Sequence, residues 1–101
     1  MALGEMRHES ALAVLLEEWE RNSMTESRKA LTLPIALSRL PRSLEFLIQV
    51  VEKQPEPVAA GALEALRIYR HDDAMRLRIR GAIDSRKSEM LHGLYTKLFE
   101  A

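Results

Sequence analysis

Cysteine is absent from the 101-residue chain, so disulfides, thiolate metal sites, iron–sulfur clusters and a cysteine nucleophile are all excluded. Aromatic residues make up only 5% of the sequence, and four prolines with four glycines are too few for the many turns of an all-β chain. No apolar run approaches the ~20 residues that cross a bilayer, and residues 1–20 lack the layout of a signal peptide. These absences favour a helical protein with no membrane segment, and we expect it in the cytoplasm.

Neither sign of charge is in excess, because 15 Lys and Arg face 15 Asp and Glu. A neutral chain argues against non-specific nucleic-acid binding as the main task. Hydrophobic residues make up 47% and charged residues 30% of the sequence, which is typical of a folded globular protein rather than a disordered one. At this length we expect a single domain over residues 1–101.

Apolar residues recur at helical spacing along the chain, while the alternation typical of long strands is missing. The sequence therefore predicts an all-α fold with helices over residues 9–21, 23–40, 42–53, 57–70, 73–84 and 88–99. Ser23 and Glu26 form a capping-box pattern for the second helix, and Asp72 is suited to cap the fifth. Pro34 lies inside the second helix, where its missing N–H predicts a kink or a break.

The sequence resembles itself when it is shifted by 32 residues. The shift superimposes apolar residues from both helices of a pair: Leu12 on Leu44, Leu15 on Leu47, Leu16 on Ile48, Trp19 on Val51, Ala30 on Ala62 and Leu31 on Leu63. A third copy is weaker, because Leu44 then falls on Arg76. Since the linkers are short, neighbouring helices should pack antiparallel. We expect three stacked helical hairpins, at about 8–40, 41–72 and 73–101.

Residues 55–75, PEPVAAGALEALRIYRHDDAM, resemble the short HEAT-like repeat of the bilin-lyase type. The small and aliphatic positions of that repeat are occupied here by Val58, Ala62, Leu63, Ala65 and Leu66. Residues 1–19 are also similar to it, with 1–7 interpreted as the remnant of a preceding repeat, whereas ALTLPIAL (30–37) departs from it through its proline. The resemblance implies a short right-handed α-solenoid of about three antiparallel helical hairpins. A compact bundle of six helices around one core is the alternative fold.

The resemblance also implies a function, because HEAT-like solenoids display a curved surface on which proteins bind. The second helix of each hairpin lines the concave side in that family. The exposed residues of those helices would be Arg28, Lys29, Thr32, Glu64, Arg67 and His71. We therefore expect a non-enzymatic scaffold that binds a protein partner on this face.

Charge is distributed unevenly along the chain. Residues 1–20 hold five glutamates and one arginine, whereas residues 67–87 hold seven Lys and Arg against three Asp. The second region predicts a basic patch of Arg70, Arg76, Arg78 and Arg80. The patch could bind an acidic protein surface or a phosphate backbone, or its arginines could pair locally, as Asp73 with Arg76 and Arg80 with Asp84. Scarce aromatic residues make nucleic acid the less favoured partner, and oppositely charged ends allow head-to-tail self-association.

Residues that could carry catalysis are few. His8-Glu9 resembles the metal-ligating pairs of the HEAT-repeat deoxyhypusine hydroxylase, but there is one pair, and a dinuclear site needs more ligands. Consecutive residues such as His71, Asp72 and Asp73 point in different directions, so they favour helix capping over metal binding. The chain also lacks a G-x-S-x-G elbow, a phosphate loop and a dinucleotide fingerprint. We expect neither catalysis nor a cofactor, with an enzyme or lyase subunit of the HEAT-like family as the alternative.

Overall fold

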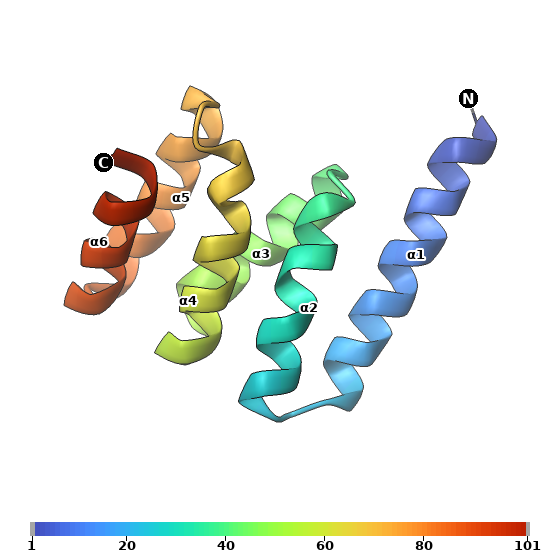
Figure 1. Cartoon of the computed structure of the whole chain (residues 1–101), viewed down its shortest axis with the longest axis horizontal. Helices are drawn as coiled ribbons and strands as arrows, with labels where there is room; N and C mark the ends of the chain where they lie inside the picture. Colours follow the sequence, from blue (N-terminus) through green and yellow to red (C-terminus); the bar gives the residue numbers. More distant parts are fainter. Residues whose placement is uncertain (1, 101) are drawn as a thin grey trace.

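The computed structural model describes the backbone of residues 2–100 and the side chains from Glu9 to Glu100. This part of the chain is helical and contains no strand. Its elements are α1 (Ala2–Arg21), α2 (Thr25–Leu37), α3 (Pro41–Lys53), α4 (Glu56–Ala65), the 3₁₀ turn η1 (Leu66–Tyr69), α5 (Asp73–Arg86), α6 (Glu89–Tyr95) and the π turn η2 (Thr96–Glu100). Figure 1 shows their order from α1 on one side to α6 on the other.

The helices lie in two layers. In one layer α2 packs against α4 and α4 packs against α6, while in the other α3 packs along α5 (Figure 1). The molecule measures 41 × 31 × 19 Å, and its smallest dimension matches two helices of about 10 Å diameter each. The predicted all-α fold with six packed helices is therefore confirmed.

Three predicted helix boundaries have clear physical causes. Asp72 caps α5 by accepting a hydrogen bond from the Met75 backbone N–H at 3.1 Å, as predicted. Ser88 caps α6 in the same way by accepting from the Leu91 N–H at 3.2 Å. Pro41 occupies the first turn of α3, where a missing N–H leaves no hydrogen bond unmade.

Other local predictions were wrong. The capping box at Ser23 does not form, since α2 begins at Thr25 with Met24 as a cap that makes no side-chain hydrogen bond. α1 begins at Ala2 rather than Glu9 and passes without interruption through His8, so His8-Glu9 does not mark a helix start. Of the kink or break expected at Pro34, the break does not occur, since α2 continues to Leu37.

The uninterrupted passage of α2 through Pro34 follows from tertiary packing. Ile35 and Ala36, directly after the proline, are completely buried. Full burial of an isoleucine side chain stabilises by about 1.5–3 kcal/mol, which is comparable to the ~3 kcal/mol that an interior proline costs. Pro34 itself is exposed, so its ring points away from the helices that α2 contacts.

The buried core follows the 32-residue spacing of the sequence. Trp19, Val51 and Ile83 occupy successive positions at that spacing and are all buried. Leu47 and Ile79 are likewise completely buried, whereas Leu15, their counterpart in α1, is half-buried. The row at 19, 51 and 83 is therefore buried in all three helices, whereas the row at 15, 47 and 79 is completely buried only in α3 and α5.

Polar side chains tie neighbouring helices at nearly the same interval. Glu9 of α1 accepts a hydrogen bond from Arg42 of α3 at 3.2 Å, and Glu45 of α3 pairs with Arg78 of α5. Both pairs span 33 residues. The same kind of bridge thus links α1 to α3 and α3 to α5.

Candidate interaction surfaces

The predicted partner-binding residues of α2 do not form one exposed row. Thr32 is only 2% exposed, because its hydroxyl donates to the Lys29 carbonyl at 2.7 Å and lies 3.2 Å from the Gly61 carbonyl of α4. A glycine at 61 lets the two backbones approach closely, since an added Cβ would lie 3.2 Å from the Lys29 Cγ. The prediction that Thr32 is exposed was wrong, and Thr32 instead joins α2 to α4.

Arg28 is also engaged within the fold. Its Nε donates to the Asn22 carbonyl at 2.6 Å, and its guanidinium lies 5.1 Å from the centre of the Trp19 ring. A second nitrogen of the guanidinium contacts Gln54 Oε1 at 3.4 Å. Arg28 therefore secures the C-terminal ends of α1 and α3 and is not free for a partner.

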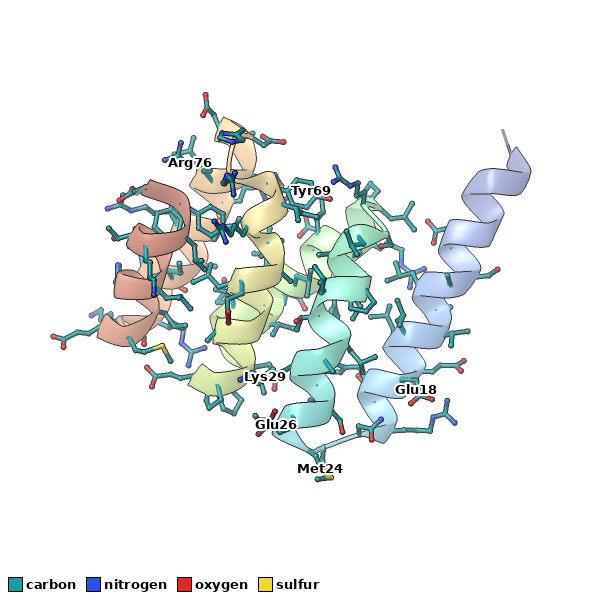
Figure 2. The ribbon with its side chains drawn as sticks, in the orientation of Figure 1. Glu18, Met24, Glu26, Lys29, Tyr69 and Arg76 are labelled. Carbon is teal, nitrogen blue, oxygen red and sulfur yellow. The ribbon has the colours of Figure 1, made fainter. Side chains whose placement is uncertain are left out.

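Lys29 and Glu64 remain at the surface, on either side of a shallow depression of about 240 Å³ between α2 and α4. Lys29 lies between these two helices in Figure 2. The depression is lined by Lys29, Thr32, Leu33, Gly61, Glu64 and Ala65, which we call the α2–α4 depression. It unites three of the six predicted residues and adds Leu33, which was not predicted.

Arg67 and His71 lie farther along the chain, in η1 and in the turn that follows, and neither lines the α2–α4 depression. Both are exposed. The Arg70 Nε donates to His71 Nε2 at 3.2 Å, so this part of the predicted surface contains one internal contact.

The arginines predicted as a basic patch are mostly paired with acids. Arg76 lies 3.9 Å from Asp73, as predicted, and Arg78 pairs with Glu45. Arg80 donates to Glu100 at 3.0 Å and lies over the Tyr95 ring. The predicted pair of Arg80 with Asp84 was wrong, because the η2 turn brings Glu100 to Arg80 while Asp84 lies 3.5 Å from His92. These contacts reduce the free positive charge of the patch.

Tyr69 lies in η1 with its phenol in a buried environment. Its buried hydroxyl has no hydrogen-bond partner among the described residues, and burial raises its pKa above the ordinary value of 10.0. Arg39, whose guanidinium lies 5.7 Å from the ring centre, opposes that shift. Figure 2 shows Tyr69 on the α2 side of η1. A phenol that stays neutral beyond its usual range serves packing between η1 and α2, and gives no sign of acid–base chemistry.

A larger groove lies between α1 and α3 and was not predicted. It consists of two adjoining depressions of about 550 and 360 Å³, both lined by Leu16 and Arg42. Most of the lining residues share one spacing, at 13, 16, 17 and 20 in α1 and at 42, 45, 46 and 49 in α3, and Arg21 and Pro41 complete the lining. Each set forms one face of a helix.

Within the described residues, no group of three or more His, Asp or Glu side chains is arranged to hold a metal ion. No helix in the same region combines the length and the apolar character needed to cross a membrane. Comparison of the sequence with protein-family models finds no matching family, and searches among curated proteins and solved structures find no significantly similar chain.

Proposed function

We propose that the chain is a short right-handed α-solenoid of HEAT-like hairpins and acts as a non-enzymatic protein-binding scaffold. Three features support the solenoid: two helix layers, buried positions that recur every 32 residues, and Glu–Arg bridges that recur every 33. In such an array each hairpin buries its apolar side mainly on its neighbours, and the exposed layer of second helices forms a surface for partners.

The observation that carries the binding proposal is the exposed side of α2. Leu33 is 48% exposed and Leu37 is 54% exposed, one helical turn apart on a helix whose Ile35 and Ala36 are fully buried. Leu33 also lines the α2–α4 depression, with Lys29 and Glu64 beside it. This arrangement fits the apolar centre and polar rim of a protein interface. The two leucines would supply the apolar centre, and Lys29 and Glu64 would supply the polar rim.

Paired arginines weigh against nucleic acid as the partner. Arg78 and Arg80 each contact a carboxylate of another helix or turn, and Arg76 has Asp73 beside it. Phosphate binding draws on free cationic side chains, and three of the four arginines predicted as a basic patch already lie beside a carboxylate. A protein partner is therefore the function that the geometry supports best.

The proposal is tested by charging the exposed leucines of α2. The double variant Leu33→Glu with Leu37→Glu should lose a partner that the unchanged chain retains in affinity capture followed by quantitative mass spectrometry. Leu77→Glu in α5 is the matched control, because Leu77 is 74% exposed and lies outside the α2–α4 depression. Far-UV circular dichroism checks that all three chains are equally helical.

Two outcomes contradict the proposal. One is a partner that the double variant of α2 and the unchanged chain retain equally. The other is a capture in which the unchanged chain retains no protein above the level of the double variant. A photo-crosslinking residue at position 33 should also label the partner, whereas the same residue at position 77 should not.

A further inference from the structure

The groove between α1 and α3 is lined by one face of each helix, and a further helix could lie between these faces. Its walls are two helix faces, each covering about two turns, with lining residues at matching intervals. Ala13, Leu16 and Phe46 supply apolar surface, and Leu16 and Phe46 are half-buried. A third helix can lay an apolar stripe between two such faces.

The groove exists because α1 and α3 are joined at separate points and do not pack along their length. Arg42 reaches Glu9 at 3.2 Å, and Trp19 packs edge-on against Phe46 with ring centres 5.0 Å apart. Between these links the two helices approach each other little, since α1 packs chiefly on α2. The corresponding junction of α3 with α5 is closed by direct packing.

The rim of the groove carries free negative charge. Glu17 and Glu20 line it, are exposed, and form no ion pair with any described residue. Arg21 and Arg42 also line the groove, and each is paired with a carboxylate, Arg21 with Glu18 at 2.8 Å and Arg42 with Glu9 at 3.2 Å. A partner that enters the groove therefore meets the exposed carboxylates of Glu17 and Glu20 beside the apolar surface of Ala13, Leu16 and Phe46.

We propose that this groove binds a short amphipathic helix of a protein partner, with an aliphatic stripe flanked by arginine or lysine. The stripe would cover Ala13, Leu16 and Phe46, and the flanking cations would pair with Glu17 and Glu20. Arginine suits these carboxylates because its planar guanidinium can bind both oxygens of one carboxylate. This site is separate from the α2–α4 depression, so the chain presents two partner surfaces on different helix layers.

The test uses a capped 14-residue synthetic peptide with leucines at helical spacing on one face, arginines on both flanks and alanine elsewhere. Amide shifts in two-dimensional NMR of the 15N-labelled chain should change in α1 and α3, and Trp19 fluorescence should change because its ring contacts the groove residue Phe46. A peptide with glutamate in place of arginine, and one with scattered leucines, should bind at least about tenfold more weakly.

Variants of the protein distinguish binding in the groove from non-specific electrostatic attraction. Glu17→Lys with Glu20→Lys should weaken binding at least about tenfold, whereas Glu26→Lys with Glu89→Lys, an equal charge change at exposed sites on α2 and α6 outside both surfaces, should alter it less than about twofold. Ala13→Phe should also weaken binding, because it fills the floor without changing charge. Ala13 is exposed, so this variant should fold.

Three results would overturn the inference: no binding of the arginine peptide at millimolar concentration, equal weakening by both lysine pairs, or shifts confined to α2 and α4. The last result would leave the α2–α4 proposal standing, and equal retention of a partner by the α2 leucine variant would contradict the α2–α4 proposal while leaving the groove standing. Failure of either site is thus distinguishable from failure of the other.

Discussion

The junction of α1 with α3 and the junction of α3 with α5 carry the same polar bridge but differ in how closely their helices pack. Glu9–Arg42 and Glu45–Arg78 each span 33 residues and link the same layer of helices. α3 and α5 nevertheless pack directly, while α1 and α3 leave a groove lined by Leu16 and Phe46. A surface ion pair therefore does not decide whether two helices close on each other.

One difference between the two junctions is the burial of the equivalent apolar positions 15, 47 and 79. Leu47 of α3 and Ile79 of α5 are completely buried, whereas Leu15 at the same place in α1 is half-buried. The C-terminal end of α3 is also covered, because Arg86 of α5 donates to the carbonyls of Val51 and Gln54. The closed junction should consequently dominate stability, and the open one should be available for binding.

The largest expected effect is a difference between two leucines at equivalent positions. Leu47→Ala should lower the free energy of unfolding by about 2–5 kcal/mol, because a fully buried leucine leaves a cavity when truncated. Leu15→Ala should lower it by about 1–2 kcal/mol, since part of that side chain is already in water. Urea unfolding followed by circular dichroism measures both, and equal losses would show that the junctions are equally packed.

The next largest effect concerns the arginine that covers the end of α3. Arg86→Met keeps most of the aliphatic stem and should cost about 1–3 kcal/mol, because two helix-end carbonyls lose a charged donor. Arg28→Met is the counterpart at the end of α1, where the Asn22 carbonyl is the acceptor. A loss below about 0.5 kcal/mol for Arg86→Met would mean that water replaces the guanidinium freely.

Several features of the fold were predictable from the sequence because they depend on local chemistry. The Asp72 cap needs only an acid before a helix, and the small and aliphatic positions recognised in the sequence at Val58, Ala62 and Leu63 are all buried in α4. Of the kink or break expected at Pro34, the break does not occur, because the packing that holds α2 together is a tertiary property. Local sequence patterns therefore predict single helices and their caps, but not the packing between helices.

The candidate surfaces depended on contacts between helices and were less predictable. The helical spacing of α2 predicts that Thr32 is exposed. In the structure the backbone of Gly61, which has no side chain, approaches Thr32 and buries it. The groove escaped prediction because the opening of α1 from α3 is not encoded in the spacing of either helix. Its two matching rows of lining residues can be recognised in the sequence only after the structure brings them together.

A smaller effect is expected in the local stability of the two junctions. Backbone amides of α1 between residues 9 and 21 should exchange with deuterium at least about tenfold faster than those in the middle of α3, because α1 has fewer tertiary contacts to break on opening. Two-dimensional NMR after transfer to deuterated buffer measures the rates residue by residue. Equal protection in α1 and α3 would mean that the helices open together despite the groove.

The smallest effect is expected from the bridges themselves. Double-mutant cycles on Glu9–Arg42 and Glu45–Arg78, each with alanine at one or both positions, should give coupling energies of about 0.2–1 kcal/mol, because all four side chains are about half exposed. The two values should also agree closely and should fall when salt is added. A coupling several times stronger for Glu45–Arg78 would show that this pair helps to close the α3–α5 junction, and buried apolar side chains would then not be the dominant cause of its closure.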